Sequence, residues 1–308
     1  MYCGNEYWKN YMEKWFGSEL IEVWEKNVRI DKIRSHGREI NLEIFESHKE
    51  DAPVIVFSHG IAGYARVLLP FIVPLFKKGY TLIVPDLQGY GYNDGLKGDF
   101  EWNVHKQNLK DAATFAKDNY KGSVWLGGAS MGGPLAYAAA SEIENVDGLL
   151  CWCLWDFSDK EFMLNETSTG KATYILIPLF KILSKLLGKM QLKTYKLISY
   201  DTLTDSKVFN ELIKKDPQAG THITLKGAAS LVLDSKPVVP HSDYIKPVLV
   251  VQPGDDRMTP KKYVKRTFEM LGSTKKKYVE IKAASHFPTK MEIYDLWANE
   301  VDQFLNEV

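Results

Sequence analysis

Residues 123–135 read SVWLGGASMGGPL, and this stretch decides how the rest of the chain is interpreted. An apolar run typical of a buried strand leads into small residues around Ser130, and a helix-forming segment follows. The small residues fit the pattern G-x-S-x-G from Gly128 to Gly132. Such a pattern is either a tight packing turn or a sharp bend that exposes a serine nucleophile. Because a nucleophile needs partners, the remainder of the chain distinguishes the two.

Strand-like and helical segments alternate on both sides of this stretch, which predicts an α/β fold with a mostly parallel central sheet and helices on both faces. The first two strand-like segments, 27–33 and 38–46, flank a turn, and Asn41 and Glu43 alternate with apolar residues as in a half-exposed strand. The later strand-like segments, with the loops that end them, are 52–60, 81–95, 123–128, 146–157, 246–260 and 276–287.

The alternation stops between Ser158 and Lys236. This segment is mainly helical in character and predicts a cap over 158–235, inserted after the sixth strand, on a core of 1–157 and 236–308. Part of it is amphipathic: Leu179, Leu183, Leu186 and Met190 share one face, and Lys181, Lys185 and Lys189 line another. We favour a cap helix packed over the core, with peripheral membrane contact as the alternative. Both interpretations, packing over the core and membrane contact, hold if the apolar face borders a substrate cavity.

The N-terminus predicts an amphipathic helix over about 5–26, with an aromatic stripe formed by Tyr7, Trp8, Tyr11, Met12 and Trp15. Packing of this stripe against the domain is favoured over membrane docking. The N-terminus has no basic segment followed by an apolar core, so it does not predict secretion. No apolar run in the sequence is long enough to span a bilayer. The expected compartment is the cytoplasm.

The composition gives no support for nucleic-acid binding, and it fits a large folded domain with reduced cysteines. Lys plus Arg number 39 and Asp plus Glu also number 39, so no electrostatic argument favours a nucleic-acid partner. Hydrophobic residues make up 45% of the 308 residues, enough for a large core. Cys151 and Cys153 alternate around Trp152, which places both on one face of a strand as reduced core thiols.

A serine nucleophile requires a base, and His286 in the loop after the last strand is the best candidate. Its acid partner is Asp256, Asp255 or Asp156, and Asp256 is favoured because RMTP follows it and turns the chain into a helix. The order serine, acid, histidine then fits a known arrangement. The other histidines are interpreted as surface or structural residues: His36, His48, His59, His105, His222 and His241.

The segment SHGIAG ends an earlier buried strand, where a second oxyanion donor is expected. The predicted donors are the backbone N–H groups of Ile61 and Met131. His59 then braces the loop. The residues expected to border the substrate are Gly60, Ala62 and Ala129.

These motifs resemble the α/β-hydrolase superfamily, and within it the monoacylglycerol lipase, lysophospholipase and serine aminopeptidase-like branch. By position, Ser130, Asp256 and His286 match the catalytic triad of that branch, and Ile61 and Met131 match its oxyanion hole. The segments that carry the resemblance are VFSHGIAGYAR (56–66), GYTLIVPDLQGYGYNDG (79–95), GGASMGGPLA (127–136), DSKVFNELIKKDPQ (205–218), VVQPGDDRMTP (250–260) and ASHFP (284–288).

The chain also departs from this branch. Gly63 and Tyr64 stand where lipase-like members often carry an acidic residue and a histidine, and Ala129 stands where histidine is often found. The glycine common before the acid is also replaced, in QPGDD. These departures remove no catalytic group, but substrate identity does not transfer.

The resemblance implies a serine hydrolase that cleaves carboxylic esters, with an apolar acyl or alkyl group under the cap and no metal or cofactor. Thioester, lactone, amide or peptide and carbon–carbon cleavage stay open as alternatives, and so does a binding protein built on a hydrolase scaffold. The expected partner is a small-molecule or lipid-like ester. The sequence leaves the oligomeric state open.

Overall fold

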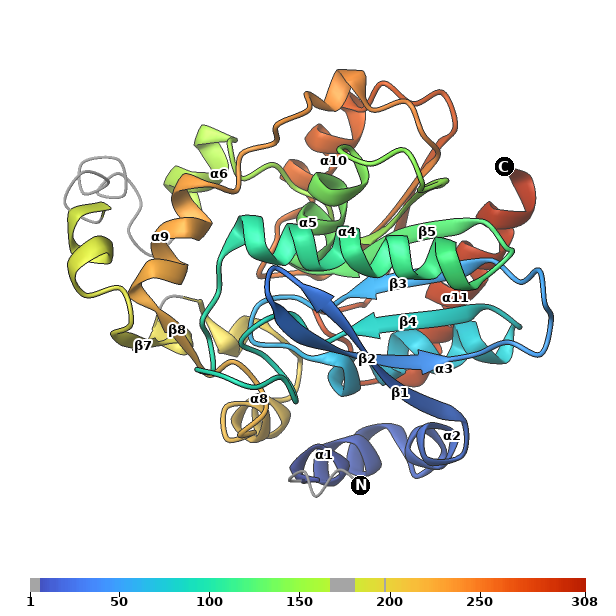
Figure 1. The fold of residues 1–308 in the computed structure, drawn as a ribbon, viewed down its shortest axis with the longest axis horizontal. Coiled ribbons are helices and arrows are strands. Elements are labelled where there is room, and N and C mark those ends of the chain that lie inside the picture. The colour runs from blue at the N-terminus through green and yellow to red at the C-terminus, as the bar shows by residue number, and fades with distance from the viewer. Residues whose placement is uncertain (1–5, 167–180, 197) are drawn as a thin grey trace.

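The computed structural model describes residues 6–166, 181–196 and 198–308. A single eight-stranded sheet, ordered β1-β2-β4-β3-β5-β6-β9-β10, forms its centre (Figure 1). The strands are β1 (Val28–Ser35), β2 (Arg38–Phe45), β3 (Val54–Ser58), β4 (Thr81–Pro85), β5 (Val124–Ala129), β6 (Gly148–Trp152), β9 (Val248–Pro253) and β10 (Lys276–Ile281).

All strands from β4 to β10 along this order run parallel, and β2 is antiparallel to both of its neighbours. Helices cover the sheet: α4 and α5 pack together against β3 and β5, while α3 and α11 pack against each other and reach β4 and β9. The longer helices of the core are α3 (Leu69–Lys77), α4 (Trp102–Asn119), α5 (Gly132–Ala140), α10 (Lys261–Met270) and α11 (Met291–Glu307). The predicted α/β architecture is therefore confirmed.

The insertion between β6 and β9 forms a separate group of elements at the left of Figure 1. The helices in its described residues are α6 (Lys160–Asn165), a helical segment at 181–186, α8 (Lys207–Ile213) and α9 (Leu225–Leu233). It also contains a two-stranded sheet that the sequence did not predict, in which β7 (Gln191–Lys193) pairs with β8 (His222–Thr224). Leu179, expected on the amphipathic face of this insertion, lies outside the described residues.

The single N-terminal helix expected over about 5–26 is instead two helices. α1 (Tyr7–Phe16) ends at Gly17, whose φ of 78° suits glycine, and α2 (Glu19–Asn27) follows. The aromatic stripe faces inward, since Trp8, Tyr11 and Met12 are fully buried. α1 therefore packs against the domain with this face.

The expectation of a half-exposed β2 is wrong. Asn41 and Glu43 are both buried. Glu43 accepts hydrogen bonds from Arg66 at 2.7 Å and from Trp24 of α2 at 2.6 Å, and Asn41 donates to Asp86 at 3.1 Å. Because these partners come from distant segments, the polar face of β2 is covered even though its alternation suggests exposure.

Cys151 and Cys153 are buried and free, but they do not share a strand face as the sequence predicted, because only Cys151 lies in β6. β6 ends at Trp152, and Cys153 follows it with a left-handed φ of 69°.

Among the described helices, none combines the length and the apolar character that a membrane span requires.

Candidate active site

Ser130 lies at the bend between β5 and α5, where the chain turns sharply. Its φ is 58°, in the left-handed region that non-glycine residues rarely adopt. Its own N–H donates to the carbonyl of Trp152 at 2.9 Å, and Gly133 donates back to the carbonyl of Ser130 at 2.9 Å. The surrounding hydrogen bonds thus hold a strained conformation, which is common at functional sites.

Glycines make this bend possible. A side chain at Gly128 would overlap the backbone of Gly132, and a Cβ at Gly132 would lie 2.5 Å from the carbonyl oxygen of Ser58. A Cβ at Gly60 would lie 2.9 Å from the Cβ of Ser130. The turn is therefore tightly packed, and Ser130 is nevertheless oriented toward a pocket.

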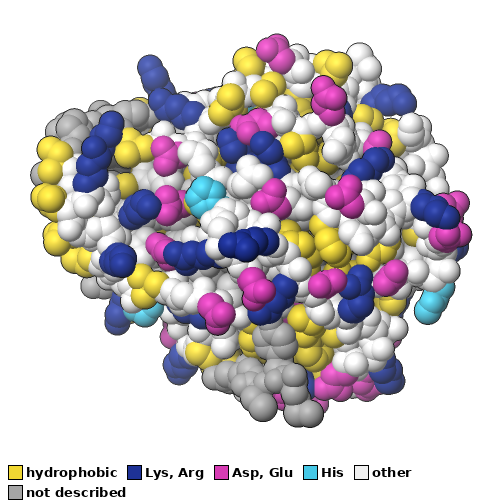
Figure 2. All heavy atoms as spheres, in the orientation of Figure 1, with side chains coloured by type: hydrophobic (Ala, Val, Ile, Leu, Met, Phe, Trp, Pro, Cys, Tyr) yellow, Lys and Arg dark blue, Asp and Glu magenta, His cyan; other side chains and the backbone are white. Residues whose placement is uncertain are grey.

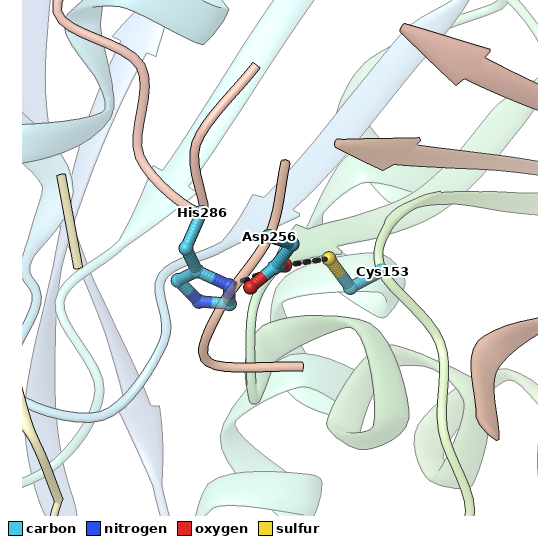
Figure 3. Close-up of side chains that lie close together, drawn as sticks. All are labelled: Cys153, Asp256 and His286. Carbon is cyan, nitrogen blue, oxygen red and sulfur yellow. Dashed lines mark hydrogen bonds and ion pairs between the residues drawn. The ribbon is translucent and has the colours of Figure 1, made fainter. Parts of the chain in front are cut away.

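Three side chains from distant parts of the chain form one hydrogen-bonded row. The Ser130 Oγ lies 2.7 Å from His286 Nε2, and His286 Nδ1 lies 2.8 Å from Asp256 Oδ2. Figure 3 shows the imidazole facing the carboxylate. Since Nδ1–H donates to Asp256, Nε2 is the nitrogen that can accept the serine proton. The His286 side chain is 2% exposed and that of Asp256 1%, so bulk water screens this row little.

The loop after β9 holds the carboxylate of Asp256 in place. Its Oδ1 accepts hydrogen bonds from the N–H groups of Met258 and Thr259, both at 2.8 Å. Burial opposes the ionised form, but the charge and hydrogen bond of His286 and the two N–H donors outweigh it and lower the pKa of Asp256. The carboxylate is therefore ionised at neutral pH.

The two alternative acids lie elsewhere. Asp255 is exposed, and its N–H donates to the carbonyl of Ala284 at 2.9 Å. Asp156 accepts hydrogen bonds from the N–H and Oγ of Ser158 and lies 3.7 Å from His241. Of the three candidates, only Asp256 hydrogen-bonds with His286 among the described contacts.

Sequence reasoning missed Cys153. Its thiol donates to Asp256 Oδ2 at 3.5 Å, the same oxygen that accepts the His286 proton (Figure 3). Burial and the neighbouring carboxylate raise the pKa of Cys153 well above its usual range, so the sulfur stays protonated. The left-handed backbone of Cys153, which turns its side chain toward the acid, leaves no trace in the residue pattern.

Cys153, Asp256 and His286 are also the one group of described residues with the spacing of metal ligands, since their ligand atoms lie within 4.8 Å of one another. Both Sγ and Nδ1 donate to a single carboxylate oxygen. An ion at this position would have to displace both protons. The hydrogen-bonded arrangement accounts for the geometry without a metal.

The loop after β3 lines the same pocket as Ser130 and His286. Among the backbone hydrogen bonds of the described loops and turns, none uses the N–H of Ile61 or of Met131. His59 accepts from the N–H of Leu87 at 3.1 Å, and its Nδ1 donates to the carbonyl of Gly60 at 2.8 Å. Burial lowers the pKa of His59 and keeps it neutral, as a brace for this loop.

The pocket beside Ser130 is largely apolar and contains no acidic side chain in its described lining. Its cavity volume is about 80 Å³. Gly60, Ile61, Ala62 and Ala129 are among the residues that line it. The larger apolar side chains that line it are Val67, Leu68, Phe71, Trp152, Ile198, Tyr200, Leu203, Ile213, Met258 and Phe287.

Solved structures share this fold at low sequence identity. A soluble variant of monoglyceride lipase from Saccharomyces cerevisiae, in complex with a substrate analogue, is 16% identical with a TM-score of 0.69 over 91% of this chain and 94% of that one. A monoacylglycerol lipase from Paleococcus ferrophilus is 17% identical, with a TM-score of 0.67 over 91% and 99%. A carboxyl esterase from Bacillus coagulans is 15% identical, with a TM-score of 0.71 over 92% and 99%.

Sequence comparisons agree with this fold. An uncharacterised 31.7 kDa protein from the traX-finO intergenic region of Escherichia coli is 26% identical over 245 residues, which are 76% of this chain and 83% of that protein. The family model described as serine aminopeptidase, S33, matches residues 49–290. That range holds most of the chain, so the resemblance inferred from the motifs is confirmed. The protein belongs to the S33 serine aminopeptidase family of α/β-hydrolases.

Proposed function

We propose that this protein hydrolyses carboxylic esters through Ser130, His286 and Asp256. His286 Nε2 takes the proton of the Ser130 hydroxyl as the oxygen attacks the ester carbonyl. The N–H groups of Ile61 and Met131 stabilise the resulting oxyanion, and ionised Asp256 stabilises the imidazolium. His286 then protonates the leaving alkoxide, which departs and leaves an acyl-enzyme. Water, deprotonated by His286, releases the acid and restores the serine.

The observation that carries this proposal is the row of hydrogen bonds from Ser130 through His286 to Asp256, at 2.7 and 2.8 Å, ending at a pocket. A purely structural serine needs no buried imidazole aligned by an ionised carboxylate. In this proposal the oxyanion donors are the N–H groups of Ile61 and Met131, which bond to no backbone carbonyl among the described loops and turns.

The pocket lining favours an ester with an apolar acyl or alkyl group. An aminopeptidase must hold the charged amino terminus of its substrate, and a buried cation needs an acidic partner. The described lining offers none near Ser130. Aromatic and aliphatic side chains such as Phe71, Leu203 and Phe287 instead match a hydrocarbon chain. Thioesters use the same serine chemistry and are the nearest alternative.

The test is a panel of p-nitrophenyl esters of increasing acyl length beside an aminoacyl p-nitroanilide. We expect turnover of the esters, with kcat/KM rising as the acyl chain lengthens, and little turnover of the anilide. Ser130→Ala should lose this activity, while Ser141→Ala, at the end of α5, should keep it. A Ser130→Ala variant with undiminished turnover, or a preference for the anilide, would refute the proposal.

A further inference from the structure

The insertion carries a patch of exposed hydrocarbon that the core does not cover. Ile182, Leu186, Leu187 and Met190 are between 46% and 75% exposed. The sequence favours a cap helix packed over the core, but among the described residues of its apolar face only Leu183 is partly buried. Figure 2 shows hydrophobic side chains gathered at the left edge, where residues 181–190 lie in Figure 1.

Lysines border this hydrocarbon. Lys181, Lys185 and Lys189 are exposed, and no ion pair of the described chain involves them. We call these three lysines and the four exposed apolar residues the cap patch. The sequence around it carries charge of one sign: residues 167–200 contain six lysines and no Asp or Glu, although the whole chain has 39 Lys plus Arg and 39 Asp plus Glu.

Backbone hydrogen bonds fix the end of the cap patch to its neighbour. The N–H of Leu225 donates to the carbonyl of Met190 at 2.8 Å, and that of Lys226 donates to Gly188 at 3.0 Å. These residues begin α9, so the segment is anchored from its inner side. The apolar side chains therefore point outward from an anchored backbone.

The combination of exposed hydrocarbon with unpaired positive charge identifies the partner. Contiguous exposed apolar residues mark interaction sites, and scattered ones need no explanation. Aliphatic side chains enter the acyl boundary of a bilayer while neighbouring lysines contact anionic headgroups. A nucleic acid would use the lysines and leave the hydrocarbon in water.

The cap patch is continuous with the pocket along the chain. Ile198, Tyr200 and Leu203 follow it in sequence and line the cavity that contains Ser130. We infer that the cap patch docks this protein on the surface of an anionic lipid bilayer, from which its apolar ester substrate enters the pocket. The second half of this inference rests on the proposed ester hydrolysis, whereas the docking itself does not.

The experiment measures vesicle binding by Ser130→Ala protein, so that turnover does not alter the lipid. Vesicles of phosphatidylcholine are compared with vesicles of phosphatidylcholine and phosphatidylglycerol in equal parts, by co-sedimentation. We expect binding to the anionic vesicles that weakens as salt is raised. Adding Leu186→Asp, or Lys185→Glu with Lys189→Glu, should weaken it about tenfold or more.

Matched controls lie outside the cap patch. Ile245 is 75% exposed, like Leu186, and Ile245→Asp should leave vesicle binding unchanged. Lys117→Glu with Lys265→Glu makes the same change of charge on α4 and α10 and should reduce binding far less than the cap pair. In the active protein, the cap variants should keep full turnover of p-nitrophenyl acetate, a water-soluble ester.

Several outcomes would overturn the inference. Equal binding to neutral and anionic vesicles would do so, as would equal losses in cap and control variants. So would self-association by light scattering that Leu186→Asp abolishes while vesicle binding persists, because the patch would then be a protein interface. Vesicle binding without any ester turnover would refute the proposed function and leave the docking intact.

Discussion

At the scale of single residues, the candidate active site depends on which carboxylate hydrogen-bonds with His286. Motif context favoured Asp256 over its neighbour Asp255, and the structure places the carboxylate of Asp256 2.8 Å from His286 Nδ1. The N–H groups of Met258 and Thr259 determine this orientation. A sequence pattern can indicate such a loop, but which of two adjacent carboxylates turns inward is decided by those backbone donors.

Asp256→Asn should reduce kcat by up to about 10⁴, because an amide cannot hold the imidazole in the tautomer that accepts the serine proton. Steady-state kinetics with a p-nitrophenyl ester measures this. Asp255→Asn and Asp156→Asn serve as controls and should stay close to wild type. A large loss in Asp156→Asn with none in Asp256→Asn would instead assign the acid to Asp156, in the loop after β6.

Cys153 is expected to act as a positioning residue for Asp256. Cys153→Ala should lower kcat/KM by about two- to tenfold, the effect of losing one hydrogen bond worth about 0.5–1.5 kcal/mol. Cys153→Ser keeps a donor and should restore most of the rate. Cys151→Ala, which removes the other buried thiol of this segment, is the control. If the alanine variant matches wild type and the serine variant is the slower one, the thiol acts only by packing.

At the scale of elements, the N-terminal helix α1 connects the cap to the loop of His286. Tyr11 and Tyr64 both donate to Asp216 Oδ2, at 2.6 and 2.8 Å. Phe209 of α8 packs edge-on against Tyr11 and stacks on Phe287, with ring centroids 5.5 and 5.8 Å apart. Residues 6–48 precede the segment that the family model matches, so α1 supports the site from outside it.

Tyr11→Phe should destabilise the fold by about 1.5–3 kcal/mol, since a buried carboxylate loses a charge-assisted hydrogen bond. Urea denaturation of the variant measures this change. Tyr80→Phe is the matched control, because Tyr80 donates to Asp302 at 2.8 Å where that carboxylate is partly exposed. Equal losses in the free energy of unfolding of the two variants would mean that the burial of Asp216 does not strengthen the contribution of this hydrogen bond to stability.

The elements that sequence predicts best are those whose own residues determine them. Buried parallel strands such as β3 and β9 read as continuous apolar runs, because both faces of each strand are covered. The prediction that the polar face of β2 is exposed fails because the residue pattern of β2 is local. Arg66 and Asp86, which cover its polar side chains, come from later in the chain. The pair β7–β8 depends on a similarly distant contact, between residues 191–193 and 222–224.

At the scale of the whole molecule, buried histidines couple stability to pH. Burial lowers the pKa of His105 from 6.5 to about 3, and also lowers those of His59 and His241. Below pH 6.5 the unfolded chain takes up protons that the folded chain does not. The contribution of these neutral histidines to the free energy of unfolding is therefore fully present above pH 6.5 and is lost as the pH falls below it.

His105→Gln tests this coupling. Between pH 6.5 and about pH 4, wild type should lose up to about 3 kcal/mol of stability that the variant does not lose. Urea midpoints across this range give the comparison. His48→Gln, at an exposed position, should follow wild type. Parallel pH profiles for wild type and His105→Gln would show that His105 gains its proton equally in both states.

The arrangement of the whole molecule could be predicted from the order of its motifs, because strand ends in a parallel sheet meet at one edge. The exposure of side chains on the insertion could not be predicted in this way. Leu186 and Met190 were expected on a packed face, and the structure leaves both exposed, since burial depends on which neighbours the insertion meets.

The most direct measurement is labelling of the intact protein with a fluorophosphonate, followed by peptide mapping. The account predicts one adduct, on Ser130, that forms in wild type, slows greatly in His286→Ala and is absent from Ser130→Ala. Folded wild-type protein that stays unlabelled, or an adduct on another serine, would contradict it.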